Sequence, residues 1–405
     1  MKILQINTLY PQGSTGNICR GIVEACQKEN IETLVACAQV GGDNQTNVFE
    51  ISSWLDHHVH NRLARITMMT GNWSYFRTRR FLKKIKKENV DLIHLHNIHG
   101  NFINVKSLFS FIKKNHIPVV WTLHDCWSYT GYCYYYDMAK CDKWKKCCGE
   151  CPYKNNDSVT VFDNSKKMFL RKKKMFTGVD ELVLVTPSLW LSREVLQSFM
   201  GKYPVKVINN GIDQNIFKRV SSNFRIEHGI NGDDFVLLGV AQGWEKRKGL
   251  DVFIKLAASL DEKFKIVLVG TNDNIDKYLP KNIISIHKTQ NQKQLAEIYS
   301  SANLFVNPTM EENFPTVNLE SLSCGTPVLT YNTGGSAEML DATCGSAIKK
   351  GDFEALEKEI LRIFLKKPFT VQACIEKAIN FNMYDRYKEY VDLYKEILNE
   401  RSAKG

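Results

Sequence analysis

The sequence predicts an α/β protein built from two doubly wound domains. Short apolar runs alternate with helical patterns in both halves of the chain, and the runs are rich in leucine and β-branched residues, as in parallel sheets buried on both faces. The length of 405 residues suits two or three domains. Since ligands of such sheets bind at the carboxyl ends of the strands, we expect two domains that face each other across a ligand-binding cleft.

The first series opens with a strand, a loop of small residues and a helix, which is the beginning of a βαβ unit. These elements are expected at residues 3–7, 13–16 and 18–29. Later strands of this half are expected at 32–37, 92–95, 119–123 and 182–186. Pro204 and the turn-prone Asn209-Asn210-Gly211 then interrupt the pattern. We therefore place an N-terminal domain at residues 1–203, with a cysteine-rich insertion at 126–153.

The second series repeats the alternation in the C-terminal half. Strands are expected at 235–240, 265–269, 283–286, 304–306 and 327–330, with helices at 250–260, 293–301 and 317–323. This series predicts a second domain at residues 204–383. The segment 384–405 is helical in pattern and is expected to pack back on the N-terminal domain.

Composition narrows the class of protein. A hydrophobic content of 43% excludes a disordered chain. The 54 Lys and Arg exceed the 43 Asp and Glu by 11, which favours an anionic partner such as nucleotide phosphates, a membrane surface or nucleic acid. No apolar run reaches membrane-spanning length, and the first residues turn polar too early for a secretory signal. These features predict a cytoplasmic protein.

The most informative segment surrounds two glutamates, Glu312 and Glu320. Pro315 stands just before a helix in which Glu320 lies about one turn inside. Backbone N–H groups at the start of that helix, near Thr316 and Val317, suit a phosphate, and the carboxylates suit sugar hydroxyls. The alternative is that both glutamates are simply solvated. The combination favours a site for a sugar nucleotide.

This segment resembles the signature of two glutamates in the retaining nucleotide-sugar glycosyltransferases of family 4, which have the GT-B fold of two Rossmann-like domains. Further matches occur in chain order at Gly13-Ser14-Thr15-Gly16, His124-Asp125, Asn209 to Asp213 with Phe217, Gly325 to Val328, and Asn332 to Gly335 with Glu338. The motifs at 94–100 and 121–127 are typical of colanic-acid-type, capsular and exopolysaccharide glycosyltransferases of bacteria.

The resemblance implies a role for each matching residue. Glu320 would hold the ribose hydroxyls of the donor, Glu312 would contact the transferred sugar, and His124 would approach the reacting centre from the opposite domain. With Lys248, the residues Glu312 and His124 form the expected catalytic set. The other donor-binding residues would be Gly16, Asn17, Asn210, Arg247, Phe314, Pro315, Thr316 and Val317. The acceptor side would hold His96, Asn97, His99 and Asp125.

The expected phosphate clamp lies between a strand and a helix. Lys248 matches the lysine of the family pattern, whereas Gly243 stands where the family has an arginine, so Arg247 would supply the guanidinium from a neighbouring position. The alternative is a solvated, basic helix start. Since the sequence contains no Asp-x-Asp triplet, we expect these cations and a helix N-terminus, rather than a catalytic metal, to neutralise the leaving diphosphate.

Six of the twelve cysteines fall within residues 126–151. In a reducing compartment, clustered cysteines more often bind metal than form disulfides. Cys133, Cys141, Cys148 and Cys151 have spacing that suits one tetrahedral ion, with Cys147 as an alternative ligand, and four thiolates leave no open position for catalysis. We therefore expect a structural zinc, with reduced cysteines that merely pack as the alternative.

Two basic stretches of the first half suggest contact with an anionic membrane surface. A solvated helix face is the alternative for each of them. The first consists of Arg77, Arg79, Arg80, Lys83, Lys84, Lys86 and Lys87, and the second of Lys166, Lys167, Arg171, Lys172, Lys173 and Lys174. Three histidines without suitably spaced partners, His57, His58 and His60, are expected at the surface.

The sequence thus predicts a retaining hexosyltransferase that moves a sugar from a nucleotide-diphosphate donor to a saccharide acceptor, which we expect to be lipid-linked. It would act in bacterial cell-surface polysaccharide biosynthesis, in the cytoplasm or peripherally on the inner face of the plasma membrane. A GT-B epimerase or hydrolase acting on a nucleotide sugar is one alternative. A non-catalytic protein that binds nucleotide sugars or nucleic acid is another, and we expect no nucleic acid because the basic stretches lie apart from the glutamate signature.

Overall fold

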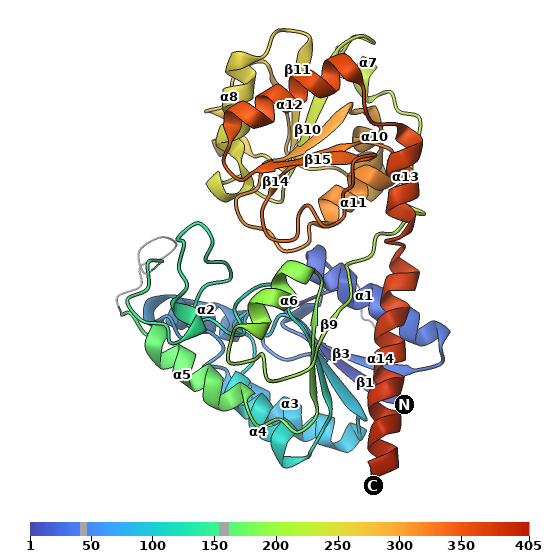
Figure 1. The fold of residues 1–405 in the computed structure, drawn as a ribbon. Helices are drawn as coiled ribbons and strands as arrows, with labels where there is room; N and C mark the ends of the chain where they lie inside the picture. Colours follow the sequence, from blue (N-terminus) through green and yellow to red (C-terminus); the bar gives the residue numbers. More distant parts are fainter. Residues whose placement is uncertain (41–46, 154–161, 405) are drawn as a thin grey trace. The chain divides into compact units, whose positions relative to one another are not determined.

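A computed structural model describes residues 1–40, 47–153 and 162–404 (Figure 1). The chain forms two compact units. Unit 1 comprises Met1–Asn209 together with Arg386–Gly405, and unit 2 comprises Asn210–Asp385. The chain therefore passes from one unit to the other between Asn209 and Asn210, within the turn-prone Asn-Asn-Gly sequence, and crosses again near its C-terminal end.

Unit 1 is built on a parallel sheet of seven strands in the order β5-β3-β1-β6-β7-β8-β9. The strands are β1 (Lys2–Ile6), β3 (Glu32–Cys37), β5 (Val48–Glu50), β6 (Leu92–Leu95), β7 (Val119–Thr122), β8 (Leu182–Thr186) and β9 (Val205–Val207). A separate pair joins β2 (Leu9–Tyr10) to β4 (Gln39–Val40). The strand order reverses between β1 and β6, which is where doubly wound sheets bind ligands.

Helices cover both faces of this sheet (Figure 1). They are α1 (Gly13–Lys28), α2 (Trp54–Thr67), α3 (Tyr75–Glu88), α4 (Val105–Lys114), α5 (Ser165–Phe176), α6 (Leu189–Leu196) and the C-terminal part of α14 (Met383–Lys404). Leu4 and Ile6 of β1 pack in one core with α3 and α4. Because side chains alternate along a strand, Gln5 points to the opposite face, where its side chain contacts Cys19 of α1.

Unit 2 repeats the plan with six parallel strands in the order β12-β11-β10-β13-β14-β15. They are β10 (Phe235–Val240), β11 (Phe264–Val269), β12 (Ile283–Ile286), β13 (Leu304–Asn307), β14 (Val328–Asn332) and β15 (Gly345–Lys349). Helices α8 (Leu250–Ser259) and α12 (Phe353–Lys366) pack into one core, and α10 (Gln292–Ser301), α11 (Thr316–Ser323) and α13 (Val371–Ile379) into the other. Short helices complete the unit at α7 (Phe224–Glu227), η2 (Lys246–Lys248) and α9 (Asp273–Asp276).

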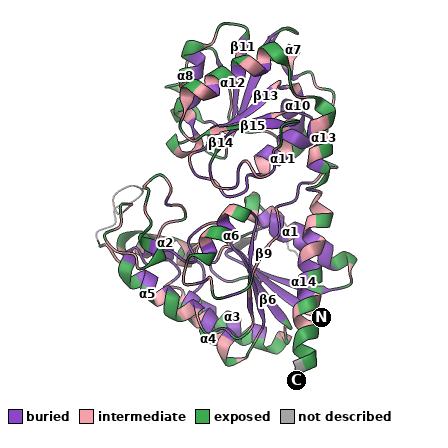
Figure 2. Cartoon of the chain, viewed as in Figure 1, coloured by how far each residue is buried: buried purple, intermediate pink, exposed green. Residues whose placement is uncertain are grey.

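The predicted α/β class is confirmed, and both sheets are buried between helices as their apolar strands require (Figure 2). The expected loop at 13–16 is wrong, because α1 already begins at Gly13. Three edge strands were not expected. β5 and β9 are each three residues long, and β15 reads Gly-Ser-Ala-Ile-Lys, so none of them contains an apolar run that sequence could distinguish from a loop.

The cysteine-rich insertion lies between β7 and α5 and contains one short helix, η1 (Lys143–Lys145). Its core is aromatic, because the Trp144 ring lies 5.0 Å from that of Tyr129 and 4.9 Å from that of Tyr136. Elsewhere in unit 1, His60 is buried and contacts Ser74, so the expectation that it lies at the surface is wrong. Within the described ranges, no helix is long and apolar enough to cross a membrane.

Candidate functional site

The expected donor residues of unit 2 gather at its switch point, between β10 and β13. Since β10 leads towards η2 and β13 leads to the loop before α11, both connections leave the carboxyl edge of neighbouring strands. The two segments are joined directly, because the Met310 N–H donates to the Arg247 carbonyl at 2.8 Å and the Thr309 hydroxyl donates to the same carbonyl at 3.2 Å. The fold therefore fixes the basic η2 segment against the glutamate loop.

Gly249 makes this close approach possible. It ends η2 with a φ of +79°, in the left-handed region that favours glycine. A Cβ at this position would lie 2.5 Å from the Pro308 carbonyl oxygen, which is too close for any other residue without a backbone shift. The glycine that follows Lys248 thus has a structural reason, because it lets Lys248 lie over the loop that carries Glu312.

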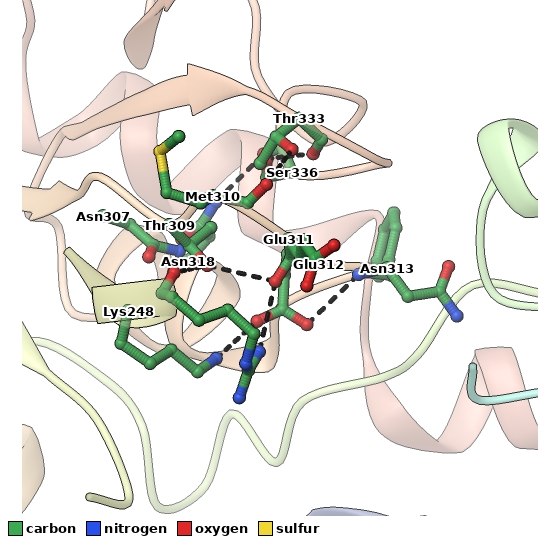
Figure 3. Close-up of polar contacts among 12 residues, drawn as sticks. Lys248, Asn307, Thr309, Met310, Glu311, Glu312, Asn313, Asn318, Thr333 and Ser336 are labelled. Atoms are coloured by element: carbon green, nitrogen blue, oxygen red, sulfur yellow. Dashed lines mark hydrogen bonds and ion pairs between the residues drawn. The ribbon is translucent and has the colours of Figure 1, made fainter. Parts of the chain in front are cut away.

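Lys248 and Glu312 form the central ion pair, with Nζ 2.6 Å from Oε2 (Figure 3). The second carboxylate oxygen of Glu312 accepts the N–H of Asn313 at 3.1 Å. Burial acts to raise the pKa of Glu312, but the charge and hydrogen bond of Lys248 outweigh it, so this pKa lies below its usual value. Glu312 is therefore ionised at neutral pH, and the ammonium of Lys248 is held in place.

Arg247 extends the cationic group towards the same loop, since its Nη1 donates to the Glu311 carbonyl at 3.2 Å. Beyond the loop, Pro315 is the N-cap of α11, and its side chain makes no capping hydrogen bond. The first N–H groups of α11, near Thr316 and Val317, are thus the end that attracts anions. Two cations and a helix N-terminus lie in one loop system, as a diphosphate requires.

Glu320 lies inside α11 and accepts a hydrogen bond from the Tyr299 hydroxyl at 3.0 Å. Burial raises the pKa of Glu320 to about 7, although the hydrogen bonds from Tyr299 and Thr316 act to lower it. Unlike Glu312, this carboxylate forms no ion pair with a described cation. It is therefore poised to accept additional hydrogen bonds, and donors such as sugar hydroxyls would favour its charged form.

Amide side chains rigidify the surroundings. Asn210 donates to the Phe314 carbonyl at 3.1 Å, which places both expected residues beside the loop. Asn307 donates to the Asn318 side chain at 2.8 Å, and Asn318 donates to the Ser336 carbonyl at 3.0 Å (Figure 3). Sequence reasoning missed this buried pair, although a polar residue at the end of an apolar strand and another inside a buried helix are signals that could have found it.

The expected acceptor residues and His124 come together in unit 1, which has its own switch point between β1 and β6. They lie at or just after the ends of β6 and β7, and they line one small cavity of about 10 Å³. The predicted residues among them are His96, Asn97, His99, His124 and Asp125. His99 Nε2 lies 2.8 Å from Asp125 Oδ2, and Trp127 donates its backbone N–H to the other oxygen at 2.9 Å. Asp125 is thus a fixed carboxylate.

A chain of hydrogen bonds orients His124. Its Nε2 lies 3.1 Å from His96 Nδ1, the two rings are stacked, and His96 Nε2 lies 3.0 Å from Gln5 Oε1. With the Gln5 oxygen facing both groups, it accepts from the Cys19 thiol at 3.2 Å and from His96, so His96 carries its proton on Nε2; the Gln5 nitrogen then has no hydrogen-bond partner among the described residues. His96 Nδ1 must then accept the proton of His124 Nε2, which leaves His124 Nδ1 unprotonated.

Both histidines are neutral at physiological pH. Burial lowers the pKa of His124 to about 4 and that of His96 well below its usual value. Sequence reasoning missed Gln5, the end of this chain of hydrogen bonds. The signal was present, since Gln5 is a polar residue in the middle of an otherwise apolar strand.

We expect His96→Leu to lower kcat about tenfold, because His124 loses the acceptor that fixes its tautomer. His96→Asn should restore most of the rate, since its side-chain oxygen can accept the same proton. Steady-state kinetics and the nitrogen NMR shifts of the His124 ring would check both changes. Equal losses in the two variants, with unaltered His124 shifts, would contradict this role of His96.

Gly16 and Asn17 lie in the first turns of α1. A Cβ on Gly16 would come within 3.1 Å of the Leu9 carbonyl oxygen and of Pro11, so the packing of the chain itself already favours glycine there. These two residues belong to unit 1, whereas Lys248, Glu312 and Glu320 belong to unit 2.

The four cysteines expected to bind zinc line one cavity of about 20 Å³ beside Trp144. Burial raises the pKa of Cys133 to about 12 and that of Cys148 to about 11, so these are thiols rather than thiolates in the absence of a ligand. Within the residues that the structure describes, no three His, Cys, Asp or Glu side chains are arranged to hold a metal ion. The structural zinc therefore stays a prediction.

Elemental analysis of the purified chain tests that prediction. We expect about one zinc per chain, lost in Cys148→Ser/Cys151→Ser and retained in Cys324→Ser, whose cysteine lies in unit 2. A wild-type protein free of metal and equally stable with and without a chelator would assign all four cysteines to packing.

Comparison with known proteins identifies the family. Residues 15–215 match the model Glycosyltransferase Family 4, and residues 220–381 match the model Glycosyl transferases group 1. The putative colanic acid biosynthesis glycosyl transferase WcaC of Escherichia coli K12 is 24% identical over 323 residues, which cover 76% of this chain and 76% of that protein.

Two solved structures share the fold along the whole chain. Sucrose-phosphate synthase from Thermosynechococcus elongatus has a TM-score of 0.73 at 16% identity and covers 98% of this chain and 99% of its own. HepE from Anabaena, solved in complex with UDP, has a TM-score of 0.67 at 15% identity, with 98% and 100% covered. The Family 4 model matches most of unit 1 and the group 1 model matches most of unit 2, so the chain belongs to the GT-B glycosyltransferases with family 4 and group 1 domains.

Proposed function

We propose that this glycosyltransferase uses a nucleotide-diphosphate sugar as donor, transfers a hexose with retention of its anomeric configuration, and acts in the assembly of a bacterial cell-surface polysaccharide. The observation that carries the proposal is the arrangement at the β10–β13 switch point. There Lys248 is paired with Glu312 at 2.6 Å, Arg247 contacts the same loop, and α11 begins at Pro315, whose side chain does not cap it.

The chemistry follows from the charges. When the bond between the sugar and the diphosphate breaks, negative charge develops on the leaving phosphates, and preorganised cations and N–H dipoles stabilise it most effectively. Lys248, Arg247 and the first turn of α11 would bind the diphosphate, and Glu320 would accept the ribose hydroxyls. Glu312 holds Lys248 in position and would contact the sugar through its remaining acceptor capacity.

The acceptor side is proposed for unit 1. His124, with its Nδ1 unprotonated, and the fixed carboxylate of Asp125 are hydrogen-bond acceptors that suit hydroxyl groups of a saccharide. The relation to WcaC supports a saccharide of a surface polysaccharide. We further propose that this acceptor is lipid-linked, so that the enzyme works peripherally at an anionic membrane surface.

A panel of nucleotide sugars tests donor use, starting with UDP-sugars because the structural neighbour HepE was solved with UDP. The true donor should raise the melting temperature by mass action, by an amount that grows with its concentration. The donor should then be incubated with saccharide acceptors, and the anomeric coupling constants of the product measured by NMR. If the reaction proceeds with retention, the transferred sugar has the same anomeric configuration in the product as in the donor.

The same experiment decides the alternative. A nucleotide-sugar epimerase or hydrolase would convert its donor at full rate without an acceptor, whereas a transferase needs one. Conversion that does not depend on any acceptor would overturn the proposed transfer. No stabilisation by any nucleotide or nucleotide sugar would overturn the donor site itself.

A further inference from the structure

A basic groove lies between α3 and α4 of unit 1, and it shares no lining residue with the cavity at the β1–β6 switch point. Its volume is about 710 Å³, which falls in the range of ligand-binding pockets. Six cations line it, and none of its described lining residues is acidic. The cations are Arg79, Lys83 and Lys86 of α3, Lys106 and Lys114 of α4, and Arg171 of α5.

The groove continues across α4. A second cavity of about 430 Å³ shares Lys106 and Arg171 with it and adds Lys113 and Lys174. Helices α3, α4 and α5 lie side by side in this order (Figure 1). The two cavities therefore form one basic surface over three helices, which we call the α3–α5 groove.

The charge of the whole chain is concentrated on these helices. Together they carry 16 Lys and Arg but one acidic residue, Glu88, so their balance is +15, compared with +11 for the entire chain. The rest of the protein is thus slightly acidic. Glu88 itself is paired with Lys2 at 3.3 Å, so it does not neutralise the groove. Such a field attracts anions from solution.

Simple explanations do not account for all of this charge. Lys86 and Lys114 lie in the last turns of α3 and α4, where cations stabilise the helix dipole. Lys106 is the second residue of α4, where the dipole disfavours a cation, so an anion at the groove would relieve that repulsion. Lys172 is excluded from the surface, because it is buried and donates to the Trp127 carbonyl at 2.7 Å.

Exposed apolar side chains accompany the cations. Tyr75 lines the groove and is 48% exposed, and its neighbour Phe76 is 84% exposed. Leu170, next to Arg171, is 51% exposed. The core-facing sides of α3 and α4 are already used, since Phe81, Leu82 and Phe109 are buried. The helices therefore cannot insert by their apolar faces, and contact is limited to headgroup depth.

We propose that the α3–α5 groove binds the phosphate groups of anionic lipid headgroups and so docks unit 1 on a membrane surface. A lipid source is favoured over a free phosphate because a small anion would not need Phe76 and Leu170, whereas a lipid surface gains from aromatic and aliphatic side chains at its interface. The inference deepens the proposed function and rests on it for its purpose, which is to bring a lipid-linked acceptor to the enzyme.

Cosedimentation of the full chain with lipid vesicles tests this. Binding is expected to vesicles of phosphatidylcholine mixed with phosphatidylglycerol, not to phosphatidylcholine alone, and it should weaken as salt rises. The groove variant Arg79→Gln/Lys83→Gln/Lys106→Gln should lose affinity about a hundredfold. The matched control Lys84→Gln/Lys87→Gln/Lys167→Gln removes the same charge from exposed positions of α3 and α5 that do not line the groove, and it should lose far less.

Phe76→Ser removes no charge, and it is expected to fold because Phe76 is exposed and does not belong to the core. This variant should weaken vesicle binding roughly tenfold. Equal losses in the groove and control variants, or binding that ignores headgroup charge, would overturn the proposal. The lipid source would also be overturned if the wild type binds inorganic pyrophosphate but not vesicles, and the groove variant binds no pyrophosphate. UDP affinity should stay at the wild-type value in all these variants, because none of the changed residues belongs to the proposed donor site. If the wild type itself does not bind UDP, that result counts against the proposed function and not against the groove.

Discussion

Lys248→Met should lower kcat by about a hundredfold to a thousandfold, the usual effect of removing one group that stabilises developing charge. The ammonium lies 2.6 Å from Glu312 and is fixed by it, so it is oriented before any donor binds. Its loss has a second consequence: Glu312 keeps a buried negative charge without its partner, at the place where the diphosphate should bind. Both effects act against transfer.

The measurement is the steady-state rate with donor and acceptor, together with the affinity for the free nucleoside diphosphate. Lys246→Met is the matched control, because Lys246 is an exposed lysine of the same short helix. It removes the same charge and should leave kcat within a factor of about two, as surface substitutions usually do. Equal rates for Lys248→Met and Lys246→Met would move the phosphate clamp elsewhere.

Glu320→Gln should weaken donor binding by about tenfold to a hundredfold at pH 8. Hydrogen bonds to a charged acceptor contribute more than neutral ones, and the glutamine keeps the shape while removing the charge. The variant should also be more stable than the wild type at that pH. Burial raises the pKa of Glu320 to about 7, which means that the folded protein bears a cost for ionising this group above pH 7.

The pH dependence has a definite sign. The folded-state pKa of Glu320 lies above that of a free glutamate, so the carboxyl contributes stability below the unfolded pKa and loses it as the pH rises towards 7. Donor affinity is expected to change in the opposite direction, because in the proposed site the ribose hydroxyls would donate hydrogen bonds to the carboxylate form. Wild-type affinity should therefore be constant above pH 7 and fall below it, and Glu320→Gln should show no such transition.

Calorimetric titration of the donor nucleotide sugar across this range would measure the affinity, and thermal unfolding would measure the stability; free UDP is less suitable, because its terminal phosphate titrates at about pH 6. Glu262→Gln, an exposed change in the same unit, is the control and should follow the wild type at every pH. A wild-type affinity that is flat between pH 5.5 and 8.5, or a Glu320→Gln variant that binds the donor normally, would be incompatible with a ribose-binding role for Glu320.

Local patterns of the sequence were sufficient for much of the fold and for the donor segment. The strand at Glu32–Cys37 and the helix start after Pro315 follow from apolar runs and a proline, which are local signals. Contacts between distant residues were not predictable in this way. The Gln5–His96 hydrogen bond joins residues 91 positions apart, and only the strand order β1–β6 brings them together. Likewise, Lys172 looks like its basic neighbours until the helix is placed against Trp127.

The C-terminal helix has a consequence for how the chain is made. Tyr394 donates or accepts a hydrogen bond with His94 at 2.6 Å, and Tyr390 accepts one from Thr122 at 3.2 Å, so residues near the end of the chain fill the interior beside β6 and β7. Unit 2, in contrast, is continuous from Asn210 to Asp385. During synthesis the first unit to emerge is thus the last to be completed, and a ribosome that stops before α14 releases a chain whose N-terminal sheet still lacks part of its cover.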